Sequence, residues 1–130
     1  MAAATACSDV TGTNRADGVY YLQAIGNTSL PASYQDSNTG RVFTAQSDQL
    51  AVNSDGTYTD QQIYRDGTFQ GSYTESGNWR QSGNVVTFNP TFSSAGYYNP
   101  YSGTLGTSGA FGGARSLSVN LGGSIWYYSE

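Results

Sequence analysis

Short glycine turns divide the chain into stretches that alternate like β-strands. Asp55-Gly56, Asp66-Gly67, Gly83-Asn84 and Gly122-Gly123 each lie between runs rich in Tyr, Thr, Val, Phe and Trp. Asp-Gly and Gly-Gly supply the positive φ angles that tight hairpin turns need. Successive hairpins in a chain of 130 residues predict an antiparallel sheet that closes on itself. A small closed barrel has one natural place for a ligand, which is its mouth and interior.

Eight strands are expected between these turns, and no helix of convincing length. The strands cover residues 19–25, 42–52, 57–65, 68–81, 85–92, 103–107, 116–121 and 124–128. Residues 32–41 are expected to form a loop or a short irregular hairpin, and residues 109–113 are too glycine-rich to be regular. The predicted fold class is all-β, an eight-stranded antiparallel up-and-down barrel in which strand 124–128 pairs with strand 19–25. Residues 1–16 are predicted to be a flexible N-terminal tail and residues 17–130 a single barrel domain.

The missing residue types restrict the chemistry of the chain. There is no histidine and no lysine, and the five arginines are scattered in a chain of net charge −4. Histidine-based triads and bases, histidine-ligated metals and Schiff-base chemistry are therefore excluded. A nucleic-acid or anionic-membrane partner is disfavoured. A glycosidase would need two carboxylates, and of the five candidates Asp55 and Asp66 are turn residues; the other three are Asp48, Asp60 and Glu75. We expect no enzymatic activity, no metal and no cofactor.

The single cysteine leaves two interpretations open. Cys7 has no partner for an internal disulfide and follows the small residues Ala4-Thr5-Ala6. Small residues before a cysteine near an N-terminus are typical of the cleavage site of a bacterial lipoprotein signal, although the basic start and apolar run of a full signal do not precede it here. Cys7 is thus either a possible lipid anchor or a free thiol in the tail.

Five segments recur in a characteristic order and spacing over residues 18–128: GVYYLQAI at 18–25 followed by Leu30-Pro31, LAVNSDGTY at 50–58, GNWRQSGNVVTF at 77–88, YSGTL at 101–105 and SIWYY at 124–128. In this order and spacing the chain resembles bacterial lipocalin-like secreted domains, which look like barrels of the calycin type. The resemblance implies an often lipid-anchored barrel without agreed catalytic residues. The chain departs from the family in its tyrosine-rich 97–101 loop and in lacking a basic ending.

The strand at residues 57–65 contains the main candidate site. The resemblance implies that Tyr58 faces inward, and Asp60, Gln62 and Tyr64 share its face because side chains alternate along a strand. Buried Asp and Gln are costly unless they are hydrogen-bonded or hydrated, so they favour a polar, ligand-holding cavity. Alternatively they lie near the open rim or satisfy each other, or a one-residue slip turns Ile63 inward and Asp60 outward. The residues expected to line the cavity are Tyr20, Tyr58, Asp60, Gln62, Tyr64, Tyr73 and Trp79.

The predicted function is non-catalytic binding of a small apolar or amphipathic molecule in the barrel interior. The protein is expected to be bacterial and secreted, periplasmic or on the cell surface, with membrane contact through a lipid anchor. The alternative is a structural module that associates with itself or a partner through β-edges or the Tyr-rich 97–101 loop. That loop is either a binding surface or a segment that folds back to plug one end of the barrel.

Overall fold

The structure is a computed structural model that describes residues 15–107 and 115–130. Cys7, most of the predicted tail and the glycine-rich segment 109–113 lie outside the described residues. Ala16, the last residue of that predicted tail, is buried; its N–H donates to Gln81 Oε1 over 2.9 Å. Among the described residues no helix has the length and apolar character needed to cross a membrane.

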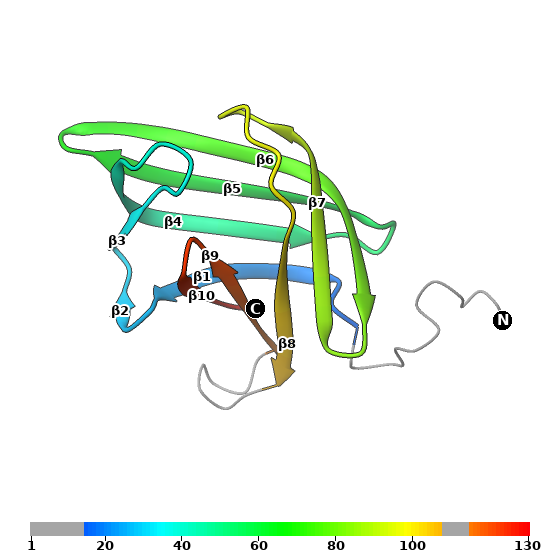
Figure 1. Ribbon diagram of the computed structural model, residues 1–130. Coiled ribbons are helices and arrows are strands. Elements are labelled where there is room, and N and C mark those ends of the chain that lie inside the picture. The colour runs from blue at the N-terminus through cyan, green and yellow to red at the C-terminus, as the bar shows by residue number, and fades with distance from the viewer. Residues whose placement is uncertain (1–14, 108–114) are drawn as a thin grey trace, which may run out of the picture.

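Ten strands make up the regular structure of the described residues (Figure 1). All eight strands predicted from the turns are present. Two short strands, β2 and β3, fall between the first and second of them. The bounds are β1 Gly18–Ile25, β2 Thr28–Ser29, β3 Ala32–Gln35, β4 Val42–Val52, β5 Thr57–Asp66, β6 Phe69–Ser82, β7 Val85–Ser93, β8 Tyr101–Thr107, β9 Arg115–Leu121 and β10 Ser124–Ser129.

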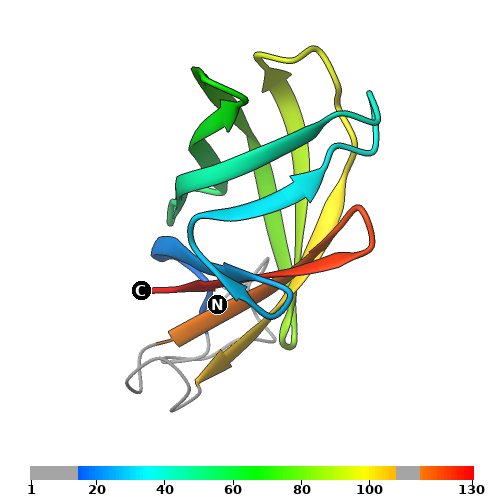
Figure 2. The same cartoon turned by 90° about the vertical axis from the view of Figure 1, so that its left-hand side faces the viewer.

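The sheet closes into an eight-stranded up-and-down barrel, which confirms the predicted fold. Strands β4 to β10 pair in chain order, and β1 completes the circle by pairing with both β10 and β4. In the first of these pairs Leu22 lies opposite Tyr128, and in the second Tyr20 lies opposite Leu50. The predicted pairing between strands 19–25 and 124–128 is therefore confirmed, and Figure 2 shows the two strands side by side.

The wall between β1 and β4 is paired over half its length. The ladder joins Gly18–Tyr21 to Gln49–Val52 and ends there. Beyond it β1 continues with β2, and β4 continues with β3 in a hairpin that the sequence predicted as irregular. The two branches separate, and a surface groove of about 540 Å³ lies between them. Asp48 and Leu30 are among the residues that line this groove.

The hairpin turns follow the glycines from which they were predicted. Gly56 has a φ of 92° and Gly67 a φ of 65°, both in the region that favours glycine. Asp55 stabilises its turn by accepting hydrogen bonds from the Thr57 N–H and hydroxyl over 3.0 and 2.7 Å. These turns place the ends of β4, β5 and β6 in register without a long connection.

Gly77 marks a bulge where β6 and β7 approach closely. The register between the two strands shifts between Ser76 and Gly77. A Cβ added at Gly77 would lie 2.1 Å from the Asn89 carbonyl oxygen and 2.8 Å from Pro90 Cα. A side chain there is sterically incompatible with this approach, so glycine is required at this bulge.

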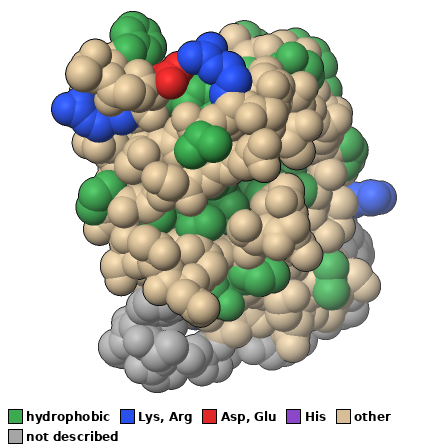
Figure 3. Space-filling model, turned by 60° about the vertical axis from the view of Figure 1, so that its left-hand side comes forward, with side chains coloured by type: hydrophobic (Ala, Val, Ile, Leu, Met, Phe, Trp, Pro, Cys, Tyr) green, Lys and Arg blue, Asp and Glu red, His purple; other side chains and the backbone are tan. Residues whose placement is uncertain are grey.

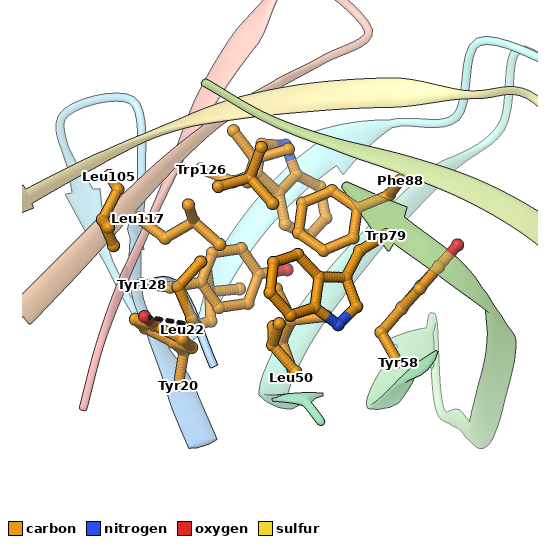
Figure 4. Packing of buried hydrophobic residues seen from close by; sticks show 14 of the residues in the cluster. Tyr20, Leu22, Leu50, Tyr58, Trp79, Phe88, Leu105, Leu117, Trp126 and Tyr128 are labelled. Atoms are coloured by element: carbon orange, nitrogen blue, oxygen red, sulfur yellow. Dashed lines mark hydrogen bonds between the residues drawn. The ribbon is translucent and has the colours of Figure 1, made fainter. Parts of the chain in front are cut away.

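The core fills the closed half of the barrel with side chains from opposite walls (Figure 4). Phe88 stacks on Tyr101 with ring centroids 5.1 Å apart, and Tyr58 packs edge-on against Phe88 at 5.0 Å. Phe69 shares the parity of Tyr73 and Trp79 on β6 yet is 63% exposed. It lies at the tip of the β5–β6 hairpin, which projects beyond the rest of the barrel (Figure 1).

An arginine seals the closed end of the barrel. The Arg115 guanidinium donates to Glu130 Oε1 and Oε2 over 2.9 and 2.6 Å, and to the Asp17 carbonyl over 2.7 Å. It also donates to the Arg15 carbonyl. Hydrogen bonds to Arg115 raise its pKa, with Glu130 as the main cause. The candidate site lies at the other end of the barrel.

Candidate functional site

The open end of the barrel contains a cavity of about 700 Å³. Three segments come together around it in Figure 2: the turn after β3, the loop before β8 and the β9–β10 hairpin. Figure 3 shows this face, with hydrophobic side chains in the recess across its middle. Side chains from inside the barrel form the floor of the cavity. The lining includes Tyr34, Phe43, Asp48, Asp60, Gln62, Tyr64, Tyr73, Glu75, Tyr97, Asn99, Tyr101, Leu121 and Trp126.

Three carboxyl groups lie together on the floor of the cavity. Asp60 on β5 lies directly opposite Glu75 on β6, and Asp48 on β4 is diagonal to Asp60 because its own partner is Gln62. Asp48, Asp60 and Glu75 are 3%, 8% and 6% exposed. We call these three residues the acidic floor.

Neutral donors hold two of the three carboxyl groups. Glu75 accepts from the Tyr58 and Tyr73 hydroxyls, each over 2.6 Å. Asp48 Oδ2 accepts from Gln62 Nε2 over 3.1 Å, and the Gln62 carbonyl in turn accepts from the Tyr34 hydroxyl over 2.6 Å. The network fixes the side chains of the floor without a positive charge.

Three buried polar atoms at the cavity have no hydrogen-bond partner among the described residues. They are Asp48 Oδ1, Asp60 Oδ1 and Trp126 Nε1. Buried polar groups are almost always bonded in folded proteins. The residues that carry these atoms line the cavity, so two acceptors and one donor without a partner lie buried at its wall.

Burial and mutual repulsion shift the pKa values of carboxyl groups in the acidic floor. Burial raises the pKa of Asp60 well above its usual range, and the neighbouring carboxyl groups of Asp48 and Glu75 raise it further. Burial also raises the pKa of Asp48, and the neighbouring polar groups of Asp60, Gln62 and Tyr128 oppose that shift. With burial as the main cause, the pKa values of the Tyr58 and Tyr73 hydroxyls are also raised, so both remain donors.

The structure brings four of the predicted site residues to the cavity. Asp60, Gln62, Tyr64 and Tyr73 line it, and Ile63 faces outward at 36% exposure, as the unslipped register requires. Tyr58 lies beneath the cavity, where its hydroxyl contacts Glu75.

Tyr20 and Trp79 are placed deeper, in the core at the closed half. The Tyr20 hydroxyl donates to the Ala16 carbonyl over 2.7 Å, a bond drawn in Figure 4. Trp79 Nε1 donates to the Asn53 carbonyl over 2.7 Å. Both polar ends are thus directed to backbone, and neither residue is among those that line the cavity.

Several residues at the cavity were not among the lining residues expected from the sequence. Asp48 shares the parity of Leu50 and Val52 on its strand, and Glu75 shares that of Tyr73 and Trp79, so strict alternation could have identified both. Others lie on the β3–β4 hairpin or on β10, where no local pattern pointed to the mouth. They include Tyr34, Phe43 and Trp126.

The tyrosine-rich loop folds back over the mouth. Asn99 Nδ2 donates to Asn38 Oδ1 over 2.9 Å, which connects this loop to the turn after β3. Tyr97 and Tyr101 line the cavity, and Tyr97 and Tyr98 are both exposed to solvent. The loop thus forms part of the wall of the cavity, close to the plugging role foreseen as one of its alternatives.

The acidic floor lacks the geometry of a metal centre. No group of three or more His, Cys, Asp or Glu residues in ranges 15–107 and 115–130 is arranged to hold a metal ion. What the cavity offers chemically is a set of hydrogen-bond acceptors surrounded by aromatic rings.

One comparison with known proteins gives a match. Residues 47–112 match the model of the family described as NlpE N-terminal domain. That stretch contains the acidic floor, the β4–β5 and β5–β6 hairpins and the tyrosine-rich loop. No curated protein and no solved structure gives a significant match. The expected resemblance to bacterial lipoprotein barrels is confirmed at that level, but the matching family is not the lipocalins.

Proposed function

Because the chain belongs to the NlpE N-terminal domain family of bacterial envelope lipoproteins, we propose that it is a non-catalytic ligand-binding domain of the cell envelope. The ligand is a small amphipathic molecule that enters the mouth of the barrel. The observation that carries the proposal is the cavity of about 700 Å³, which lies in the size range of small-molecule sites, about 300–1,000 Å³.

The walls and the floor of the cavity support an amphipathic ligand. Aromatic side chains form part of the rim: Tyr34 packs on Trp126 with ring centroids 4.8 Å apart, and Phe43 on Tyr64 at 5.0 Å. These rings provide apolar contact area, whereas the acidic floor beneath them is polar. A molecule with an apolar body and a polar head matches both parts.

The assembly alternative has less support. Each of the eight barrel strands is paired on both sides over part of its length, so the barrel proper offers no continuous free edge. The tyrosine-rich loop contributes Tyr97 and Tyr101 to the cavity. Both features favour a ligand-binding barrel over an assembly module.

A fluorescence titration tests this function. The neutral probe N-phenyl-1-naphthylamine should bind the full chain with a rise in emission, and native mass spectrometry should detect small molecules that co-purify. Ser124→Trp should block the probe, because Ser124 lines the cavity. The matched control is Ser102→Trp on the exposed outer face of β8, which should leave binding unchanged. Equal binding by both variants, or no binding by the wild type, would contradict the proposal.

Under this proposal Cys7 is the candidate site of lipid attachment. The family match supports it, since the family consists of envelope lipoproteins. Expression with an alkyne-labelled fatty acid in a bacterial host should label a precursor that carries a lipoprotein signal ahead of Cys7, and Cys7→Ser should abolish the label. Labelling that persists in the Cys7→Ser variant would contradict this assignment.

A further inference from the structure

We propose that the cavity selects a cationic amphipathic ligand, whose ammonium group binds the acidic floor while its apolar body lies against the aromatic rim. This inference rests on the proposed function, because it names the chemical class of molecule that the same cavity takes.

The charge distribution is the first argument. The chain has no lysine and no histidine. None of its five arginines, all of them described, is among the residues that line the cavity. Arg41 pairs with Asp66, and Arg115 pairs with Glu130 at the closed end. Within the described residues, no cationic side chain lines the cavity with Asp48, Asp60 and Glu75, and a cationic ligand would supply the missing positive charge.

The unpartnered atoms are the second argument. Asp48 Oδ1 and Asp60 Oδ1 are buried acceptors without a donor among the described residues. An ammonium group carries up to three N–H donors and suits such a pair. Trp126 Nε1 is a separate unpartnered donor on β10, which only β1 separates from β4 in the barrel, and Trp126 lines the same cavity. Both observations indicate a cavity shaped for a ligand with polar atoms and not for a hydrocarbon alone.

The aromatic residues are the third argument. The faces of aromatic rings attract cations, and organic ammonium groups are commonly held by several rings together. Tyr34, Phe43, Tyr64, Tyr73, Tyr101 and Trp126 all line this cavity. Rings also accommodate the carbon atoms next to the nitrogen, so an organic amine uses the floor and the rim at once. A bare metal ion would use the floor alone, and the described residues do not have the arrangement that it needs.

Proton release should accompany the binding of such a ligand. The titratable groups around the floor are the carboxyl groups themselves and the hydroxyls of Tyr34, Tyr58, Tyr73, Tyr101 and Tyr128. Asp36 and Tyr64 also line the cavity. Burial is the main cause of the raised pKa values of Asp48 and Asp60 in the free protein. A bound cation favours their ionised forms, so the affinity for an amine should increase with pH.

Calorimetry with three probes of one chain length tests the inference. Octylammonium, 1-octanol and octanoate differ in head-group charge and share the same apolar body. At pH 8 octylammonium should bind the full chain at least about tenfold more tightly than octanol, and octanoate should bind weakest. Between pH 8 and pH 5 the affinity for octylammonium should fall while that for octanol stays constant, because an alkylammonium keeps its charge below about pH 9.

Substitutions in the floor provide the second measurement. Asp60→Asn should weaken octylammonium binding at least about tenfold and leave octanol binding within about twofold. Asp55→Asn, in the exposed β4–β5 turn, is the matched control and should change neither. Asp48→Asn replaces Asp60→Asn if the latter does not fold.

The three probes separate the two proposals. If octanol binds as tightly as octylammonium and Asp60→Asn is without effect, the cationic ligand is refuted and the binding domain stands. If none of the three probes binds, both proposals fail.

Discussion

At the scale of single residues, Asp60 links the site to stability. Its folded-state pKa is raised, mainly by burial, above the unfolded value of about 3.9. The folded state then binds a proton more tightly than the unfolded chain, so the free energy of unfolding falls as pH rises from about 4 through the folded pKa. Asp60→Asn cannot ionise, and its stability relative to the wild type should increase over that window. Thermal unfolding at pH 4 to 8, followed by circular dichroism, measures the difference.

Asp55→Asn is the control, because its effect on the free energy of unfolding should depend on pH in the opposite direction. Hydrogen bonds from Thr57 lower the pKa of Asp55, the hydroxyl being the larger cause. That stabilisation is present above the unfolded pKa and is lost as pH falls through the folded one. The Asp55→Asn variant should therefore be less stable than the wild type at neutral pH, and the deficit should disappear in acid. Parallel pH profiles for the wild type and Asp60→Asn would show that Asp60 is not desolvated in the folded state.

A second residue-scale prediction concerns the tyrosine hydroxyl beneath the floor. Tyr58→Phe removes a donor that lies 2.6 Å from Glu75 Oε2 in a buried position. Hydrogen bonds to charged groups contribute about 1.5–3 kcal/mol, so urea unfolding should show a loss of that size. Tyr21→Phe, on the exposed outer face of β1, should change stability by less than about 0.5 kcal/mol. Equal effects from the two variants would rule out a structural role for this bond.

At the scale of elements, the prediction of the strands rested mainly on the residue types in the turns. Asp-Gly and Gly-Gly pairs have few alternatives to a tight turn, and therefore the eight barrel strands were predictable from the sequence. The β3–β4 hairpin, with its polar six-residue turn at 36–41, has no such signature and was expected only as a loop or irregular hairpin. Local pattern identifies strands well where a glycine fixes the backbone between them.

The sequence predicted which side chains of the site face into the barrel, but it did not predict their position along the barrel axis. Alternation placed Asp60 and Gln62 inside, and it also placed Tyr20 and Trp79 inside, where they are. It could not tell that the first pair lies at the mouth and the second at the base. Depth depends on the stagger of strands around a barrel, a property of closure that no single strand encodes.

Gly77 tests the role of a single bulge in its element. Gly77→Ala would bring a Cβ within 2.1 Å of the Asn89 carbonyl oxygen on the neighbouring strand. Backbone must then move, so we expect a loss of at least about 2 kcal/mol in urea unfolding. Gly106→Ala is the matched control, because its nearest neighbour is the Ser116 side chain at 3.2 Å; it should cost less than about 1 kcal/mol. Similar losses in both variants would mean that the β6–β7 approach is not tight.

At the scale of the whole molecule, closure depends on the last strand. Deletion of residues 124–130 removes the buried Trp126 and Tyr128 and leaves the inner edges of β1 and β9 unpaired. The truncated chain should lose its cooperative thermal transition or aggregate, since open strand edges recruit other chains. Adding a synthetic peptide of residues 124–130 should restore part of the transition. An unchanged melting temperature after truncation would contradict closure as the basis of stability.

The half-paired wall between β1 and β4 has a mechanical consequence. The ladder that joins these strands stops at Tyr21 and Gln49, so on the mouth side the cylinder is slit along one seam. A slit tube widens under a small load, whereas its unslit portion keeps its cross-section. We therefore expect the two ends of the barrel to differ in stiffness. The diameter of the mouth adjusts to ligands of different size, whereas the base keeps its diameter and its strand register.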